Sequence, residues 1–252
     1  MTADVEVRDG VAHVRLTRDA IDLATARGLL DAAHRTRSED VRAVLLTSAG
    51  RSFCLGGDLK EFAAVSDLRG HLLQVTSALH EALRIFATLD APLVAAVHGA
   101  VAGAGLGLVA AADLAIAADD ATFVAAYTGI GYTPDAGVSW SLPRLIGPRR
   151  ALDLLLTNRT MDATEALDAG LLTAVVPPQQ VIPAATELAA QLAAGPTQAF
   201  AVTKRLVRQG LQVPFSAHLD DESRAIADAG VSAHGCEGVA AFLSKRRPRY
   251  TS

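Results

Sequence analysis

Two uninterrupted apolar runs, each followed by a glycine-bearing loop and then a helix, constrain the fold of this chain most strongly. The first run covers 41–47 and leads into the loop 49–57, and the second covers 93–97 and leads into the loop 99–107. Such a run is typical of a strand that is covered on both faces, as in a parallel sheet flanked by helices. The repeated order of strand, loop and helix therefore predicts an α/β fold.

Other segments in the first part of the chain extend this pattern. Residues 4–9 and 11–16 alternate in polarity around Asp9-Gly10, which predicts a β-hairpin. The spacing of apolar residues further predicts helices over 22–37, within 58–90 and over 106–112, and short strands over 114–118 and 121–125. We expect the loop 99–107, which is rich in small residues, to be flexible up to the start of its helix.

Beyond residue 178 the pattern changes to helices alone. The helices that we expect there cover 181–194, 197–209, 215–229 and 236–244. We therefore place a boundary near Pro177-Pro178, with a core over 1–178 and a C-terminal helical region over 179–252.

Composition excludes several classes of protein. Of the chain's 252 residues, 50% are hydrophobic and 20% are charged. Disordered chains have fewer hydrophobic residues than this, so we expect a folded protein. Its formal net charge of −4 argues against a nucleic-acid partner. The one long apolar stretch, 91–118, contains a proline, a histidine, four glycines and an aspartate, so we expect no membrane span.

Two cysteines, Cys54 and Cys236, stand without metal-ligand spacing. They indicate a reducing compartment without a disulfide framework, and the first ten residues lack the pattern of a signal peptide. We therefore expect a cytoplasmic protein without a metal site. Cys54 is interpreted as a small buried side chain, and His98, after the second buried run, as structural.

The two glycine loops are candidate binding sites for a negatively charged oxygen. Each leaves a buried strand and enters a helix, whose first N–H groups have no intrahelical acceptor. Taken singly, the first loop also fits an ordinary turn capped by Asp58, and Gly103-Ala-Gly-Leu-Gly in the second fits a weak dinucleotide motif. Two such loops in one chain can each aim one backbone N–H at the same oxygen, which is the geometry of an oxyanion hole.

A third glycine-rich segment, 129–137, contains Asp135 between Pro134 and Ala136. A carboxylate in apolar surroundings is a candidate general base, although an aspartate at this place also fits a turn or a helix cap.

These three segments, in this order, resemble the crotonase (enoyl-CoA hydratase/isomerase) superfamily. The resemblance extends to 236–250, which is similar to the family's closing pattern of Glu-Gly, Ala-Phe and Lys-Arg followed by proline and an aromatic residue. It implies a crotonase-like spiral of ββα units with a C-terminal helical trimerisation region. It also implies a homotrimer or a dimer of trimers, and an acyl-CoA thioester ligand, so that coenzyme A enters as part of the substrate and no separate cofactor is needed.

The resemblance also assigns roles to residues by position. The oxyanion N–H groups belong to Gly57 and Ala104, and Asp135 is the catalytic acid/base. The positions that it assigns to the substrate and coenzyme A are Leu55, Gly56, Asp58, Leu59, Gly103, Tyr127, Pro134 and Lys245, the last for the phosphates.

Two departures from the family pattern decide the expected chemistry. Hydratases of this family carry two glutamates that handle water, and the matching positions here hold Gly107 and Tyr127. Asp135 lies where isomerase branches place an aspartate, and Pro134-Asp-Ala-Gly resembles the ring-epoxide isomerases of phenylacetate breakdown. We therefore expect an acyl-CoA isomerase that moves a double bond, or rearranges a ring epoxide, through a thioester enolate.

Three alternatives stay open at this point. The chain could be a hydratase-like lyase with another way of activating water, or an acyl-CoA binder without activity. Asp135 could also be a nucleophile, as in the aryl-CoA dehalogenase branch, which uses a histidine and a tryptophan near the ring. His80 and Trp140 are present, although neither aligns securely with those positions.

Overall fold

The expected N-terminal hairpin begins a six-stranded sheet in the computed structural model, which describes residues 3–38 and 40–250. In spatial order its strands are β1 (Ala3–Arg8), β2 (Val11–Leu16), β3 (Ala43–Ser48), β4 (Leu93–Val97), β6 (Leu114–Ala118) and β9 (Ala174–Val176). The first two strands are antiparallel and all other neighbours are parallel. Asp9 and Gly10 turn the hairpin with φ values of 49° and 77°, the left-handed backbone that a two-residue turn requires.

A second sheet has three strands, in the order β5 (Ala100–Ala102), β7 (Thr122–Val124) and β8 (Thr160–Asp162). Part of the loop that was expected over 99–107 is a paired strand, and β5 is held on both sides. It pairs with β7, and the Ala102 N–H donates to the Cys54 carbonyl at 2.9 Å. Small side chains allow this close approach between the second loop and the first.

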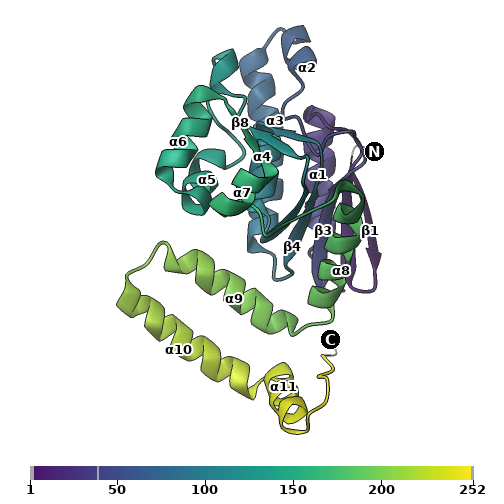
Figure 1. Ribbon diagram of the computed structural model, residues 1–252, viewed down its shortest axis with the longest axis vertical. Coiled ribbons are helices and arrows are strands. Elements are labelled where there is room, and N and C mark those ends of the chain that lie inside the picture. Colours follow the sequence, from purple (N-terminus) through teal and green to yellow (C-terminus); the bar gives the residue numbers. More distant parts are fainter. Residues whose placement is uncertain (1–2, 39, 251–252) are drawn as a thin grey trace.

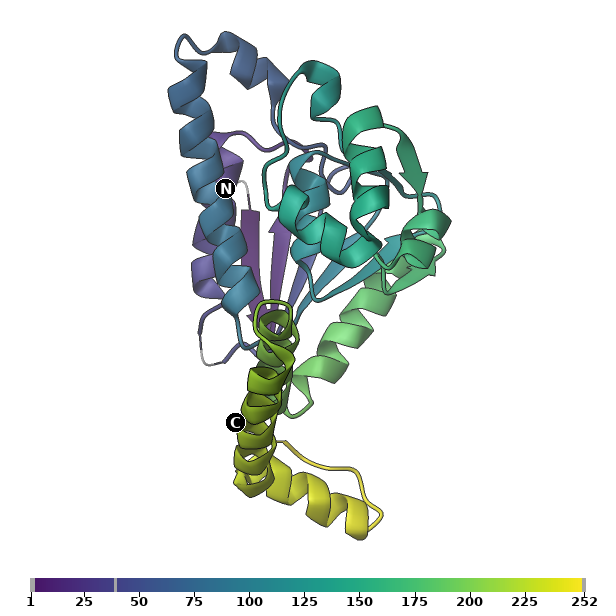
Figure 2. The same ribbon diagram turned by 90° about the vertical axis from the view of Figure 1, so that its left-hand side faces the viewer.

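Helices cover both faces of the larger sheet. Figure 2 shows α3 (Leu68–Thr88) and α8 (Val181–Ala193) on opposite sides of it, and α1 (Leu23–Arg35) packs beside α3. The remaining helices of this part are α2 (Leu59–Ala64), α4 (Ala104–Ala111), η1 (Thr128–Ile130), α5 (Val138–Ile146), α6 (Pro148–Thr157), α7 (Ala163–Ala169) and η2 (Pro178–Gln180).

Helix α8 begins just after the predicted boundary at 178 and packs against the larger sheet. It was assigned to the C-terminal helical region, but it contacts β3, β4 and β6 and buries Val181, Ala185 and Ala189 against the sheet. The sequence pattern predicted this helix but not the strands against which it packs. By packing, the core therefore ends after α8, near Gly195-Pro196.

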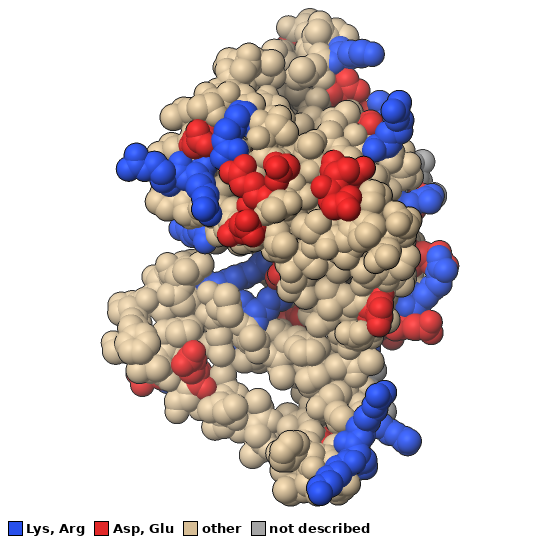
Figure 3. Space-filling view, viewed as in Figure 1, with Lys and Arg blue, Asp and Glu red and all other residues tan. Residues whose placement is uncertain are grey.

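Three helices project from this core: α9 (Thr197–Gly210), α10 (Phe215–Val231) and α11 (Ala233–Leu243) (Figure 1). Neither α9 nor α10 contains a buried residue. Large apolar side chains are exposed on this region, among them Leu211, Phe215, Ile226, Val231, Phe242 and Leu243. Figure 3 shows that the surface over α9 and α10 carries few charged side chains. An isolated chain would leave this apolar surface in water.

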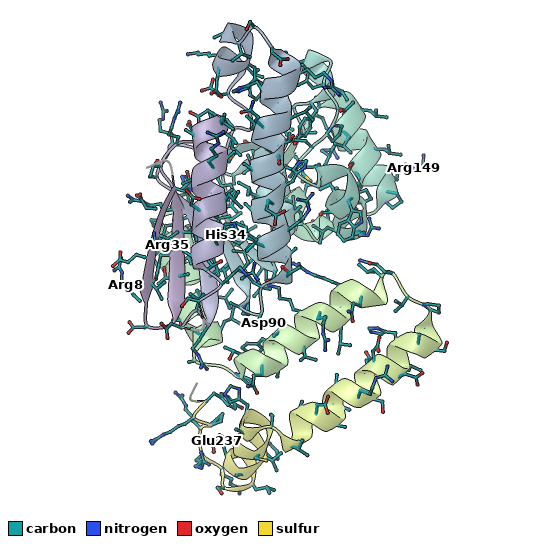
Figure 4. The ribbon with its side chains drawn as sticks, turned by 180° about the vertical axis from the view of Figure 1, so that it is seen from behind. Arg8, His34, Arg35, Asp90, Arg149 and Glu237 are labelled. Atoms are coloured by element: carbon teal, nitrogen blue, oxygen red, sulfur yellow. The ribbon has the colours of Figure 1, made fainter. Side chains whose placement is uncertain are left out.

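An ion cluster attaches α9 to the core. Asp113, just before β6, binds Lys204 at 2.7 Å and Arg208 at 2.9 Å. Its Oδ2 also accepts the Leu93 N–H at 2.8 Å, so one carboxylate joins α9 to β4. Asp90, labelled in Figure 4, marks the edge of the core that α9 meets.

No helix within the described ranges combines the length and the apolar character that crossing a membrane requires.

Candidate active site

The two glycine loops touch each other at the start of the site. In the first loop, the Ile21 N–H donates to the Gly56 carbonyl at 2.7 Å, and the Asp58 N–H donates to the Ile21 carbonyl at 3.1 Å. In extended chain, alternate N–H groups point to opposite sides, so the Gly57 N–H between them points away from Ile21. A Cβ on Gly56 would lie only 3.3 Å from the Ala104 nitrogen, which shows how closely the loops approach.

The second loop supplies the other amide. Ala104 is the first residue of α4, where an N–H has no intrahelical acceptor. Gly103 precedes it with φ 52° and ψ −122°, a conformation that a residue with a side chain rarely adopts. The structure thus places the Gly57 and Ala104 amides on adjoining loops, as an oxyanion hole requires.

Asp135 lies beside these loops and shares a hydrogen bond with Tyr127. The Tyr127 hydroxyl donates to Asp135 Oδ1 at 2.7 Å. Burial, then the nearby Asp135 charge, raise the pKa of the Tyr127 phenol far above its usual value, so it stays protonated. Tyr127 therefore holds one carboxylate oxygen, and Oδ2 remains for a ligand.

The segment that carries Asp135 fills the space beside Gly107. A Cβ built on Gly107 would lie 2.5 Å from the Ala136 carbonyl oxygen and 2.6 Å from the Ala136 Cβ. On its other side, the Ala136 N–H donates to His80 Nε2 of α3 at 3.0 Å. The turn that presents Asp135 is therefore held between α3 and α4.

One cavity of about 750 Å³ joins these groups. Of the predicted site residues, those that line it are Leu55, Gly56, Gly57, Leu59, Gly103, Ala104, Tyr127, Pro134 and Asp135. Asp58 is a helix cap instead, since its side chain accepts the Lys60 and Glu61 N–H groups at 3.0 and 3.2 Å.

Lys245 also lies away from the cavity. It follows α11, which Figure 1 shows at the opposite end of the molecule from α2, and Glu237 of that helix is labelled in Figure 4. Within one chain, the structure therefore does not bring Lys245 to the site that the resemblance assigned to it.

The individual residues of the apolar wall could not be placed from the sequence, although its helices were expected within 62–80. Helix α3 supplies one part of this wall, through Leu68, Leu72, Val75, Thr76 and Leu79, and Ile130 and Tyr132 line the cavity from another segment. The five α3 residues follow helical spacing and lie on one face, so the periodicity was visible. It indicated an amphipathic helix without showing that part of its apolar face borders a cavity.

Two further residues, Cys54 and His98, have the structural surroundings that the sequence analysis expected. Cys54 is fully buried, and burial raises the pKa of its thiol to about 12, so it is not a thiolate nucleophile. His98 Nε2 bonds to the Gly50 carbonyl at 2.9 Å. Among the described residues, no three histidine, cysteine or acidic side chains gather as a metal site would need.

The fold is α/β, and residues of both glycine loops line one largely apolar cavity together with Asp135. A sequence model of the enoyl-CoA hydratase/isomerase family matches residues 6–252. The chain therefore belongs to the enoyl-CoA hydratase/isomerase family.

Named relatives within the family differ in their chemistry. The chain is 40% identical to a protein of Rhodobacter capsulatus named probable enoyl-CoA hydratase, over 99% of this chain and 98% of that one. It is 35% identical to 4-chlorobenzoyl coenzyme A dehalogenase-2 of an Arthrobacter species, over 96% and 90%. It is 36% identical to 1,2-epoxyphenylacetyl-CoA isomerase of Escherichia coli, over 85% and 83%.

The fold is also that of solved structures in the family. An enoyl-CoA hydratase from Bacillus anthracis superposes with a TM-score of 0.93 at 31% identity, over 99% of both chains. The α/β fold with C-terminal helices, and the family, are thereby confirmed.

Proposed function

We propose that this protein is an acyl-CoA isomerase in which Asp135 moves a proton between two carbons of the acyl group. The observation that carries the proposal is the shared cavity, because Gly57, Ala104 and Asp135 all line it. The positions that hold water-handling glutamates in hydratases of the family are Gly107 and Tyr127 here.

The thioester carbonyl would accept hydrogen bonds from the two amides. Asp135 Oδ2 removes a proton from the carbon next to the carbonyl or from the γ carbon, and the electron pair of the broken C–H bond moves into the enolate. Each oxyanion donor stabilises this charge by about 3 kcal/mol. The same carboxyl group then returns the proton to a different carbon, so the double bond moves with no net change of atoms.

Packing around Gly107 supports isomerisation over hydration. The space that a longer side chain at position 107 would need is filled by Ala136, which follows Asp135 directly. Presenting Asp135 in this way thus leaves no room for a carboxylate on α4 at the same position. Hydration by another arrangement of groups is the alternative function.

The walls of the cavity are mostly apolar, although Arg69 of α3 also lines it, and they favour an acyl group with a large apolar surface. Leucine, valine and isoleucine side chains provide most of its apolar lining, and the Thr76 hydroxyl donates to the Leu72 carbonyl at 2.8 Å. An alkyl or ring-bearing acyl group suits such walls, because burying its surface needs no polar partner.

Comparing two reactions on the same enzyme tests this proposal. Purified protein would be given a 3-enoyl-CoA ester and, separately, the matching 2-enoyl-CoA ester, with products separated by chromatography. We expect conversion of the 3-enoyl to the 2-enoyl ester, with hydration of the latter at least a hundredfold slower. Hydration at an equal or greater rate would overturn the proposal, and binding without turnover of either ester would favour an inactive acyl-CoA binder.

A second candidate is nucleophilic attack by Asp135 on an aryl-CoA ester. Two observations favour it: the similarity to the Arthrobacter dehalogenase, and the contact of His80 with the residue after Asp135. Trp140 gives no support, because its ring lies under Arg144 with 4.0 Å between them. Here the carboxylate would displace a halide and form an aryl ester that water hydrolyses. Intact-protein mass spectrometry after mixing with 4-chlorobenzoyl-CoA would detect that ester.

We also propose that the apolar surface of α9, α10 and α11 joins copies of the chain into a homotrimer or a dimer of trimers. The exposed leucine, isoleucine and phenylalanine side chains there support it.

A further inference from the structure

His80 contacts the segment that carries Asp135, although it lies 56 residues before Ala136 in the sequence. Its Nε2 lies 3.0 Å from the Ala136 nitrogen, and the backbone N–H is the donor. A ring nitrogen that accepts a hydrogen bond carries no proton, so the imidazole is neutral, with its proton on Nδ1.

Ala136 needs external support for its conformation. It has φ 49°, in the left-handed region that costs a residue with a side chain about 1 kcal/mol or more. Gly137 follows with φ 73°, so the chain makes two left-handed steps immediately after Asp135. These steps turn the backbone from Pro134 into α5, and they determine where the Asp135 carboxylate points.

We propose that His80 is a positioning residue for Asp135: its neutral ring holds the Ala136 amide and so keeps the carboxylate facing the cavity, and protonation of the ring releases this hold. The inference rests on the proposed role of Asp135 as the base. His80 touches no substrate atom in this account; it acts only through the backbone that carries Asp135.

The consequence of protonation follows from the donors and acceptors involved. A protonated imidazole has N–H groups at both nitrogens and cannot accept from Ala136. Histidine is the side chain that commonly changes charge between about pH 5 and 8. The Ala136 N–H would then lose its acceptor while buried, and the left-handed turn would lose a bond that offsets its strain.

The charged groups that face His80 come from three helices and the segment before β6. On the side away from the acyl cavity His80 lines a second cavity, whose charged residues are Arg84 of α3, Asp113 before β6, Arg144 of α5 and Arg208 of α9. The one carboxylate in that set already binds Lys204 and Arg208. On its own helix, Glu81 binds Arg84 at 2.7 Å, and Asp135, which directly precedes Ala136, accepts from Tyr127.

Two substitutions separate the hydrogen bond from the charge. His80→Gln offers an amide oxygen to Ala136 but does not titrate, whereas His80→Leu offers no acceptor. His98→Gln is the control, because His98 also bonds to a backbone group but lies against Gly50. Rates and KM for a 3-enoyl-CoA ester would be measured from about pH 5.5 to 8.5.

We expect His80→Leu to lose about tenfold in kcat at pH 8 with KM nearly unchanged, as for one lost hydrogen bond. His80→Gln should keep most of its activity at pH 8, and its rate should fall less toward the acidic end of the range than the rates of the wild type and His98→Gln. Wild-type kcat in His80→Leu, or an unchanged acidic limb in His80→Gln, would overturn the inference.

Hydrogen exchange keeps the inference testable without turnover. The Ala136 amide should exchange faster in His80→Leu than in the wild type, and near the wild-type rate in His80→Gln at pH 8. Unchanged protection in His80→Leu refutes the positioning role alone. Retained turnover in Asp135→Asn refutes the proposed base instead, so the two failures are distinguishable.

Discussion

At the scale of single residues, the site depends on a carboxylate whose two oxygens have different surroundings. Asp135 Oδ1 accepts the Tyr127 hydroxyl at 2.7 Å, while the side chain as a whole lines the acyl cavity. Tyr127 is only 8% exposed and its phenol stays protonated, so this bond persists across the working pH range. The role that we assign to Tyr127 is to orient the base.

Removing the Tyr127 hydroxyl tests that role. Tyr127→Phe keeps the ring but loses the hydrogen bond, so we expect kcat to fall about tenfold with little change in KM. Tyr132→Phe removes a hydroxyl from the same cavity and is the matched control, with kcat within about twofold of wild type. Steady-state kinetics on both variants decides the matter, and equal losses would show that Tyr127 has no special part.

Filling the space beside Gly107 tests the packing that presents Asp135. Gly107→Ala places a Cβ 2.6 Å from the Ala136 Cβ, so we expect a loss of about 1–3 kcal/mol in the free energy of unfolding. Turnover should fall as well, because Ala136 must move. Gly230→Ala, in a helix with open space around it, should instead add about 0.5–1 kcal/mol. Urea unfolding measures both; an unchanged or raised stability in Gly107→Ala would contradict the packing argument.

Several site positions were predictable because glycine in a loop indicates a backbone conformation that other residues rarely adopt. Gly56 and Gly103 have φ values of 85° and 52°, and both loops line the cavity as expected. Asp58 was assigned to the ligand, but an aspartate before a helix serves equally as its cap, and the sequence does not distinguish the two. The contact of His80 with Ala136 depends on how α3 packs against the segment that carries Asp135. This packing joins residues far apart in the sequence, so it could not be predicted from local sequence patterns.

At the scale of elements, the position of α9 against the core depends on a small cluster of partly buried charges. Lys204 and Arg208 both bind Asp113, and the Lys204 ammonium also donates to the Ala91 carbonyl at 3.0 Å. Burial lowers the pKa of Lys204, so desolvation opposes its charge and the carboxylate is needed to compensate.

Asp113→Asn tests this attachment. It leaves two cations without their carboxylate, so we expect a loss of about 3 kcal/mol in the free energy of unfolding. Glu81→Gln removes the carboxylate of the exposed pair with Arg84 and should cost less than about 1 kcal/mol. Equal, small losses in urea unfolding at one protein concentration would show that the cluster does not secure α9.

Elements were predictable where one period ran through the whole element. Strands β4 and β6 have the predicted bounds, and the long helices begin and end within a few residues of expectation. The three-residue strands β5, β8 and β9 were missed, because they are too short for a period and exist through pairing with distant segments. The packing partner of α8 could not be predicted for a similar reason. Its amphipathic pattern indicates an apolar face but not which surface that face covers.

At the scale of the whole molecule, the projecting helices carry the apolar surface that we propose joins copies of the chain. Phe215, Ile226 and Phe242 are 76%, 73% and 83% exposed, values unusual for large apolar side chains.

Light scattering coupled to size-exclusion chromatography tests the assembly. We expect a mass of three or six times the chain mass of 26.1 kDa. The double variant Ile226→Glu with Phe242→Glu should lower that mass, because it places charge on the apolar surface. Val7→Glu, on the exposed side of β1, is the control and should leave the mass unchanged. A wild-type monomer would contradict the proposed assembly.

In the proposed function, Asp135 moves a proton on carbon while the Gly57 and Ala104 amides hold the thioester oxygen. The most direct measurement is exchange of solvent deuterium into a 3-enoyl-CoA ester and a saturated acyl-CoA ester, followed by mass spectrometry for the wild type and Asp135→Asn. We predict deuterium at the α or γ carbon with the wild type, and none with Asp135→Asn despite equal binding of the ester. Equal exchange by both proteins, or none by either while both bind the esters, would contradict the account.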